Sequence, residues 1–285
     1  FPLPATQKYY RSRPLNMLGF LVGHEGKGSL LSLLKEEGLA SGLSAGGGDS
    51  TSSYTSFNIN IQLTPKGLKR YTKVIERTFQ YLRLLREKSL PRYVYEEVRR
   101  MAEIDYRFAE KTGGTRLVNM FSLLMQIYPL RSVESTPFLI SEYRPRLFDS
   151  MLFRLIPENM LALLAAKNLE TDQTEKYYGT EYAYLESRAD LIKKWKKVKS
   201  HPKLSMPEAN PFLPESLEVL PFSGTLSLSY QSLAGLKREG LDAELMQKLE
   251  EQAGQSFENL DEILKNVGFQ GTTVERRAFR ETLSK

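Results

Sequence analysis

The 285-residue chain contains no cysteine and only two histidines, His24 and His201. Without cysteine, the chain can form no disulfide, offer no thiolate to a metal and use no cysteine nucleophile. It also lacks an apolar run of the roughly 18 residues that a membrane-spanning helix requires. We therefore expect no membrane partner, and the compartment, cytoplasmic or periplasmic, stays open. The hydrophobic content of 41% is sufficient to bury a core.

Charge is unevenly distributed along the chain, whose net charge is +6. Residues 222–285 contain 8 Lys or Arg and 10 Asp or Glu, so the positive excess lies in residues 1–221. The densest basic blocks are Lys66–Arg77 and Lys193–Lys197. Basic surfaces attract nucleic acids or acidic peptides, but no zinc finger or RNA-binding aromatic motif accompanies these blocks. We interpret them as solvated helix faces and expect no nucleic-acid partner.

The segment Gly23–Ser29 combines residue types found in metal and phosphate sites, but its spacing fits neither. Zinc peptidases place two histidines and a glutamate on one helix, as H-E-x-x-H or H-x-x-E-H, whereas the third residue after Glu25 is Gly28. A P-loop needs a glycine five residues before its Gly-Lys pair and Ser or Thr after the lysine. Leu21 and Gly28 occupy those positions, so neither site is predicted.

Apolar residues spaced three and four apart predict two helical pieces within residues 14–37, separated at Gly26–Gly28. Ser29 is placed to cap the second piece, and Gly38 to end it. Thr64 and Pro65 favour the start of another helix, as a capping hydroxyl followed by proline.

A β-hairpin is predicted between these helices. Residues 39–45 form its first strand, the glycine-rich run 46–50 its turn, and residues 57–63 its second strand. The second strand alternates apolar with polar residues, which indicates one buried and one solvated face.

Further elements are expected downstream. A helix starts at Pro91 and ends at Gly113 and Gly114, and its acidic residues do not form a doubly acidic face, because Glu97 lies one turn from Arg100 and Met101. No catalytic acid–base pair is therefore predicted. The remaining expectations are helices at 116–127, 136–154, 236–253 and 257–267, a buried strand at 160–166 and a short strand at 224–230.

These elements predict an α+β fold with a mixed or antiparallel sheet covered on one face by helices. Residues 1–200 are expected to form the main domain. Five prolines between residues 201 and 221 indicate a linker. Residues 222–285 then form a helical tail, which we leave unassigned or interpret as the start of the next domain.

The run Leu18–Leu31 follows the pattern L-G-x-L-x-G-H-E-G-x-G-S-L-L. Other distinctive runs occur in order at Phe1–Pro4, Lys8–Tyr10, Tyr128–Leu130, Glu142–Pro145, Pro157–Asn159, Thr174–Tyr182 and Pro207–Pro214. Together they resemble the second, non-catalytic domain of the insulysin/pitrilysin (insulinase) family of zinc metallopeptidases. The resemblance covers residues 1–221 and implies the same architecture of helices on one face of a sheet.

The resemblance implies a domain that shapes a chamber around peptide substrates and anchors them at an exosite. The implied exosite residues are Gly23, Glu25, Leu43, Ser44, Ala45, Gly46 and Gly47. An exposed strand edge can accept an extended peptide as a further strand, and a carboxylate such as Glu25 could pair with the peptide α-ammonium.

The family's catalytic motif has no counterpart in this sequence, so the chain is expected to bind no cofactor and to be inactive alone. Zinc would belong to a catalytic domain of the parent enzyme, and that domain and a C-terminal part would be partners of this one. The alternative is an inactive homologue that serves as scaffold or partner subunit of an oligomeric peptidase.

Overall fold

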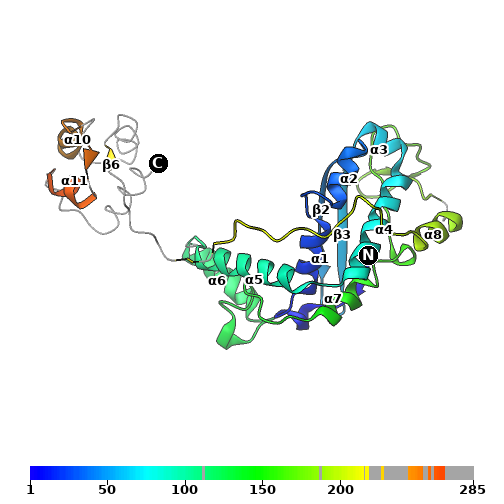
Figure 1. Ribbon diagram of the computed structural model, residues 1–285, viewed down its shortest axis with the longest axis horizontal. Helices are drawn as coiled ribbons and strands as arrows, with labels where there is room; N and C mark the ends of the chain where they lie inside the picture. Colours follow the sequence, from blue (N-terminus) through cyan, green and yellow to red (C-terminus); the bar gives the residue numbers. More distant parts are fainter. Residues whose placement is uncertain are drawn as a thin grey trace. The chain divides into compact units, whose positions relative to one another are not determined.

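The chain forms two compact units, residues 1–215 and 216–285, each considered by itself here. The computed structural model describes residues 1–110, 113–185, 188–214, 216–217, 226–227, 243–252, 256–257 and 260–266 (Figure 1). Within these ranges no helix is both long enough and apolar enough to cross a bilayer.

The first unit begins with a short strand and two helices, continues with two long paired strands, and is then mainly helical. Its strands are β1 (Pro2–Pro4), β2 (Ala40–Ser50), β3 (Tyr54–Leu63), β4 (Gln173–Thr174) and β5 (Glu181–Tyr182). Its α-helices are α1 (Pro14–Val22), α2 (Leu30–Glu36), α3 (Pro65–Lys69), α4 (Tyr71–Lys88), α5 (Arg92–Arg107), α6 (Gly114–Leu124), α7 (Pro145–Leu152) and α8 (Ala189–Lys196). Single 3₁₀ turns lie at η1 (Gln7–Tyr9), η2 (Leu130–Ser132) and η3 (Pro157–Asn159).

The main sheet is antiparallel, with strand order β1-β3-β2. Helices α1 and α2 pack against β2, and Phe57 of β3 is fully buried beneath this layer. On the opposite face, Asn58 and Asn60 are exposed. The α+β prediction, with helices on one face of the sheet, is therefore confirmed, and all described strand pairs are antiparallel.

Helix α4 joins the sheet layer to the remaining helices (Figure 1). Phe79 and Leu82 are buried, and Tyr81 is fully buried between them. The Tyr81 hydroxyl donates to the Leu21 carbonyl of α1 at 2.9 Å, and burial raises the pKa of this phenol. A buried hydroxyl costs stability unless it is hydrogen-bonded, so this contact fixes α4 against α1.

The predicted capping residues act as expected. Ser29 Oγ accepts from the Ser32 amide, and Thr64 Oγ1 from the Gly67 amide. Gly38 adopts a φ of +67° just after α2 ends, a conformation that glycine adopts without steric cost.

Three boundary predictions were wrong. Helix α5 ends at Arg107, and Gly114 instead opens α6. Residues 136–144 are not helical, because α7 begins only at Pro145, whose ring disfavours helix in the residue before it. The strand predicted at 160–166 is absent: Leu161 and Leu163 are 87% and 91% exposed and pair with no described strand. A strand needs a neighbour to satisfy its backbone.

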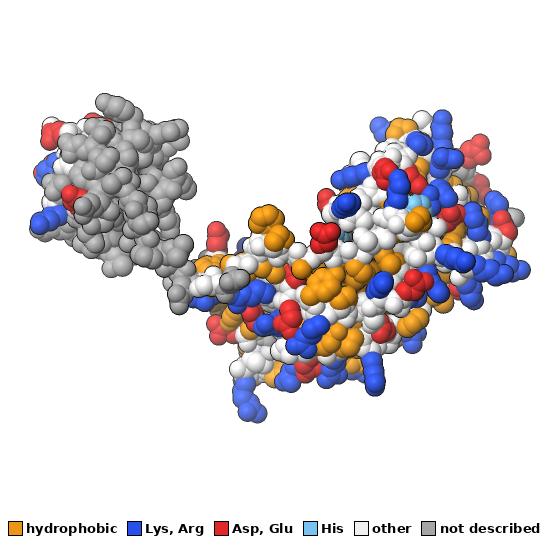
Figure 2. Space-filling view, in the orientation of Figure 1, with side chains coloured by type: hydrophobic (Ala, Val, Ile, Leu, Met, Phe, Trp, Pro, Cys, Tyr) orange, Lys and Arg blue, Asp and Glu red, His pale blue; other side chains and the backbone are white. Residues whose placement is uncertain are grey.

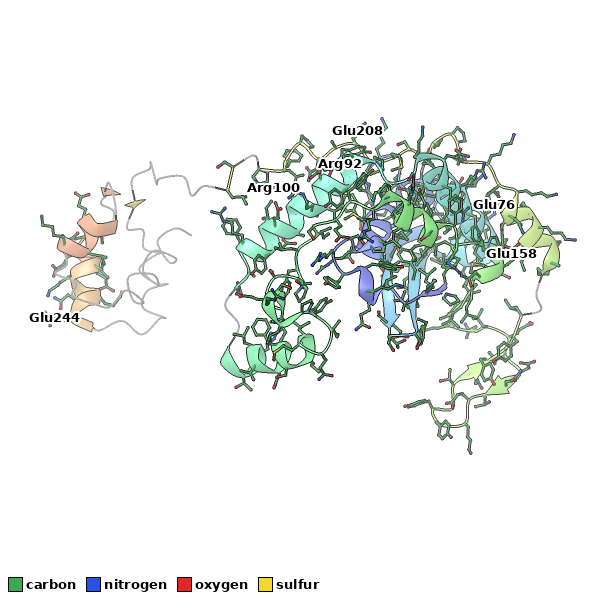
Figure 3. The ribbon with its side chains drawn as sticks, turned by 90° about the horizontal axis from the view of Figure 1, so that it is seen from below. Glu76, Arg92, Arg100, Glu158, Glu208 and Glu244 are labelled. Carbon is green, nitrogen blue, oxygen red and sulfur yellow. The ribbon has the colours of Figure 1, made fainter. Side chains whose placement is uncertain are left out.

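The proline-rich residues 201–214 contain no helix or strand, as expected, but they are packed against the rest of the first unit. We call them the strap. Leu204 and Pro207 are buried, and the strap runs beside α5 (Figure 3), whose Tyr93 and Arg100 donate hydrogen bonds to strap carbonyls.

The described part of the second unit consists of β6 (Leu226–Ser227), paired with β7 (Ser256–Phe257), and helices α10 (Ala243–Glu250) and α11 (Leu260–Asn266). Met246, Leu249, Ile263 and Leu264 form its buried positions. Helices were predicted at 236–253 and 257–267, and α10 and α11 lie within these ranges. Residues 251–252 are not helical and Phe257 belongs to β7, so these ends of the predictions were wrong, and the other residues of both ranges lie outside the described residues.

Candidate functional site

The strand that carries five of the seven expected site residues lies at the edge of the sheet. Among the described strands, β2 pairs with β3 alone. An edge strand presents unpaired N–H and C=O groups along its outer side. Backbone pairing with an extended peptide is therefore chemically possible along this strand.

Antiparallel register divides the site residues between two faces. Leu43, Ala45 and Gly47 lie opposite Ile61, Ile59 and Phe57, which belong to the apolar face. Ser44 and Gly46 lie opposite Asn60 and Asn58 on the polar face.

The expected turn at residues 46–50 was wrong, because β2 continues through this run to Ser50. The reversal occurs at Thr51, whose Oγ1 accepts from the amides of Ser53 and Tyr54. Hydroxyl side chains commonly form such turns. A register shift between Gly47 and Ser50 absorbs the extra length. The glycines thus lengthen the edge strand and do not reverse the chain.

Helix α1 approaches the edge strand through two glycines four residues apart. A β-carbon at Gly19 would lie 3.0 Å from the Ala45 carbonyl oxygen, and one at Gly23 would lie 3.6 Å from the Ala45 amide nitrogen. Residues four apart share one helix face, so both glycines allow α1 to rest on the backbone at Ala45. Gly19 was not singled out from the sequence, although its spacing to Gly23 was the available signal.

The loop after Gly23 is fixed at both ends and exposed in the middle. At its start, the His24 Nδ1 atom accepts from the Gly26 amide at 3.1 Å. At its end, Gly28 has a φ of +79° and its carbonyl accepts from the Ser205 amide of the strap at 3.0 Å. A β-carbon at Gly28 would lie 2.0 Å from Ser205 Oγ, so only glycine lets the strap pass.

Glu25 projects from this loop into solvent, with a side chain 67% exposed. Its one ion pair among the described residues is to Lys35, at 4.0 Å. Exposed pairs of this length contribute little to stability. The carboxylate is therefore accessible to an ammonium group.

The strap is held by one face of α5. The Tyr93 hydroxyl donates to the Pro207 carbonyl at 2.6 Å, and Glu97 Oε2 accepts from the Asn210 amide at 3.1 Å. Arg100 donates to the Pro214 carbonyl. Glu97, considered above as an acid–base candidate, thus binds backbone and is buried.

The two basic blocks of the sequence meet at a buried carboxylate. Glu76 of α4 binds Lys73 Nζ and Lys194 Nζ, each at 2.6 Å. Burial alone would raise the pKa of Glu76, but hydrogen bonds from Lys194 and Lys73 outweigh it and lower the pKa. Figure 3 shows Glu76 beside α8, over which Figure 2 shows a concentration of Lys and Arg. This arrangement holds α8 against α4 and has no catalytic geometry.

No three His, Cys, Asp or Glu side chains among the described residues are grouped so that they could hold a metal ion. His24 uses its Nδ1 atom locally. His201 lies near Arg77, and burial together with that charge lowers its pKa. The residues described here therefore do not fit a catalytic zinc, and no step is assigned to one.

Comparison with known proteins places both halves of the first unit. The family model described as "Peptidase M16 inactive domain" matches residues 1–101, and "Middle or third domain of peptidase_M16" matches residues 106–232. Their boundary falls inside helix α5, although residues 1–215 form one compact unit.

Similar proteins include human insulin-degrading enzyme, 36% identical over 217 residues, which are 75% of this chain and 21% of that protein. Human nardilysin is 32% identical over 218 residues, 74% of this chain and 19% of that protein. The yeast A-factor-processing enzyme (Saccharomyces cerevisiae) is 32% identical over 221 residues, which cover 77% of this chain and 21% of that protein.

Among solved structures, pitrilysin superposes with a TM-score of 0.73 at 23% identity, covering 79% of this chain and 25% of that chain. This likeness supports the fold. The chain spans about a fifth of the length of the curated relatives it matches. The two family models and these relatives show that the chain belongs to the insulinase/pitrilysin (M16) peptidase family and carries its inactive and middle domain regions.

Proposed function

We propose that this chain is the non-catalytic, chamber-forming part of an insulinase/pitrilysin-type zinc metalloendopeptidase, and that it anchors peptide N-termini. The accessible edge of β2 carries the proposal. An extended peptide adds there as a strand beside Leu43–Gly47. Its α-ammonium pairs with Glu25, which belongs to a loop fixed against the same strand through Gly23.

The polar and apolar faces of β2 support a sequence-tolerant exosite. Gly46 has no neighbouring atom within 4 Å of the place where a side chain would begin. Ser44, on the same face as Gly46, is exposed. A peptide side chain that points across the polar face therefore meets little steric resistance, while its backbone supplies the affinity. Asn16 and Phe20 of α1 are uncharged, so neither can pair with a charged group of the peptide. In this proposal Glu25 therefore recognises the positive charge of the peptide N-terminus.

Bond cleavage in this proposal belongs to a separate domain of the parent enzyme, which holds the zinc ion and its activated water. The catalytic and C-terminal domains are partners of this chain, and peptides are the substrates. Purified alone, the chain is expected to contain no stoichiometric zinc and to hydrolyse no peptide. Chelator-sensitive cleavage by the isolated chain would contradict this part of the proposal.

The exosite is tested by peptide binding to the 285-residue chain. A fluorescent peptide with a free N-terminus is expected to bind at least several-fold more tightly than its N-acetylated form, and backbone N-methylation should weaken both. Glu25→Gln should remove the preference for the free amine. Glu87→Gln, a change at an exposed glutamate of α4 that pairs with Arg83, is the matched control. Equal affinities of the free and acetylated peptides for the unmodified chain would refute the Glu25 assignment.

A further inference from the structure

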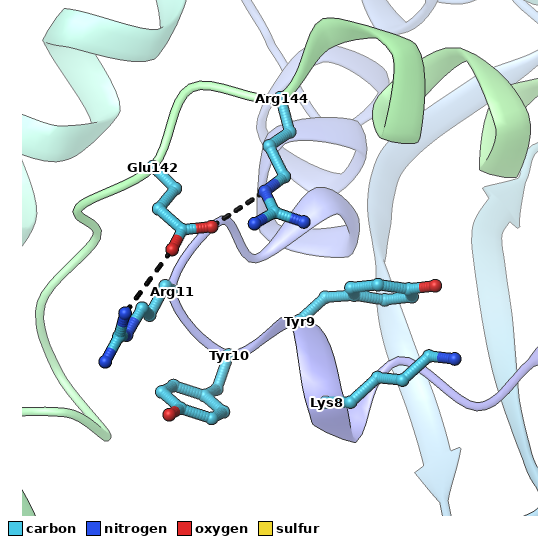
Figure 4. Close-up of a pocket in the computed structure, with 6 residues that line it drawn as sticks. All are labelled: Lys8, Tyr9, Tyr10, Arg11, Glu142 and Arg144. Atoms are coloured by element: carbon cyan, nitrogen blue, oxygen red, sulfur yellow. Dashed lines mark ion pairs between the residues drawn. The ribbon is translucent and has the colours of Figure 1, made fainter.

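A cavity in the first unit joins two motifs that the proposed function does not use. Its volume is about 260 Å³, and its walls are Lys8, Tyr9, Tyr10, Arg11, Glu142 and Arg144 (Figure 4). Residues 8–10 and 142–144 belong to runs singled out from the sequence, and the fold brings them together across more than a hundred residues.

Backbone contacts hold the two walls in place. The Arg11 carbonyl accepts from the amides of Ser141 at 2.9 Å and Glu142 at 3.1 Å. Arg13 adopts a left-handed φ of +40°, and its guanidinium donates to the carbonyls of Tyr10 and Thr136. A non-glycine residue in that region is strained, and such strain persists where surrounding contacts enforce it. The cavity is thus built by fixed backbone.

The charges around the cavity do not balance. Lys8, Arg11 and Arg144 contribute three positive charges, and Glu142 one negative charge. Glu142 is bridged by Arg144 Nε at 2.7 Å and Arg11 Nη1 at 3.6 Å. This leaves an excess of two positive charges at a concave surface, where the field attracts an anion.

The geometry of Arg144 specifies the kind of anion. Because its Nε atom is used by Glu142, its two terminal nitrogens face the interior of the cavity, on the side of Tyr9 (Figure 4). Within the described residues these nitrogens have no other hydrogen-bond partner. A guanidinium with two free parallel donors matches the two oxygens of a carboxylate.

Two tyrosines line the cavity beside these donors. The Tyr10 ring packs edge-on against Tyr128, with centroids 5.5 Å apart, and Lys8 Nζ lies 5.1 Å from the Tyr9 ring centroid. Both rings are half-buried, so each keeps part of its surface open to contact with a ligand. We propose that this cavity is a carboxylate-binding subsite for a peptide, with Arg144 binding the carboxylate and the tyrosines contacting the adjacent side chain.

A carboxylate can come from a peptide C-terminus or from an acidic side chain, and three small probes distinguish them. They are N-acetylphenylalanine, its amide, and the α-amide of N-acetylglutamate. None has a free amine, so none engages Glu25, and Glu25→Gln should not change their binding. The test of this subsite is therefore independent of the test of the proposed exosite.

Binding of each probe to the full chain is measured by NMR titration or calorimetry at low ionic strength. N-Acetylphenylalanine is expected to bind with a Kd on the order of 1 mM, typical of a small fragment, and its amide at least ten-fold more weakly. The glutamate probe identifies the source: binding tighter than that of N-acetylphenylalanine assigns the site to acidic side chains, and weaker binding assigns it to C-termini.

Arg144→Gln should reduce acid binding at least ten-fold. The matched control is Arg83→Gln, because Arg83 is also 52% exposed and also binds a glutamate through Nε at 2.7 Å. Fluorescence of the buried Trp195 verifies that both variants fold. Equal binding of acid and amide, or equal loss in both variants, would overturn the proposal.

Discussion

Replacing Gly67 with alanine should destabilise the chain even though Gly67 lies in a helix. Alanine is favoured over glycine in helix interiors by about 1 kcal/mol. In α3, however, a β-carbon at Gly67 would lie 1.8 Å from the Leu39 carbonyl oxygen. Normal van der Waals contact requires a further separation of roughly 1.5 Å or more, so α3 and the residue preceding β2 must move apart.

That movement breaks a defined set of hydrogen bonds. The Thr64 amide donates to the Leu39 carbonyl at 3.1 Å, and Thr64 Oγ1 donates to the Gly38 carbonyl at 2.7 Å. Each such bond contributes about 1 kcal/mol net. After subtracting the gain in helix propensity, Gly67→Ala should lower the free energy of unfolding by about 1 kcal/mol.

The assay is denaturant unfolding followed by the fluorescence of Trp195, the only tryptophan of the chain. Trp195 is 7% exposed and stacks on Phe79, with ring centroids 6.2 Å apart, so it reports on the first unit. Gly114→Ala is the control: it also lies in a helix of that unit, with no atom within 4 Å of the added carbon. It should be neutral or stabilising by up to about 1 kcal/mol. If Gly67→Ala were as stable as Gly114→Ala, the close approach of α3 to Leu39 would be refuted.

Three further outcomes are expected. Gly28→Ala should lower the free energy of unfolding by about 1–2 kcal/mol, because alanine disfavours the left-handed φ of this position. It should also speed proteolysis within the strap, because the added β-carbon meets Ser205. Adding Ser205→Gly should restore resistance to proteolysis, but it should not recover the stability lost to the unfavourable φ. The pKa of Glu76 is lowered in the folded chain, so its stabilisation is present above the unfolded pKa of about 4.3 and is lost as pH falls through the folded value. When the free energy of unfolding is measured as a function of pH in the acid range, it should fall less steeply in Glu76→Gln than in the unmodified chain. Leu161→Ser with Leu163→Ser should change stability by less than about 0.5 kcal/mol, and a loss of several kcal/mol would indicate burial.

Local signals predicted much of the fold, because caps and periodicity act over a few residues. Ser29, Thr64 and Gly38 perform the roles that their positions indicate. The alternation at residues 57–63 produced β3. The edge position of β2 follows from pairing partners distant in sequence, so it was an inference from family resemblance and not from the residues themselves.

The errors have a common physical origin in long-range contacts. The run at 46–50 resembles a turn by composition, yet pairing with β3 extends it as strand. The apolar run at 160–166 resembles a buried strand, yet no described strand pairs with it. The prolines after residue 200 indicate a linker, yet backbone groups of the strap form hydrogen bonds with side chains of α5. Nothing in the sequence near these α5 residues indicates that they bind a segment more than a hundred residues away.

The proposed exosite and the strap meet at the same short loop, and we expect this loop to give the proposed exosite its rigidity. At one end of the loop Gly23 rests on Ala45 of the edge strand, and at the other end Gly28 binds Ser205 of the strap. Between these fixed points Glu25 remains exposed. A carboxylate that is accessible but carried on anchored backbone pays little entropy on binding an ammonium group. Release of the strap would therefore weaken N-terminal anchoring through loss of order at Glu25, while the pairing edge of β2 itself remained intact.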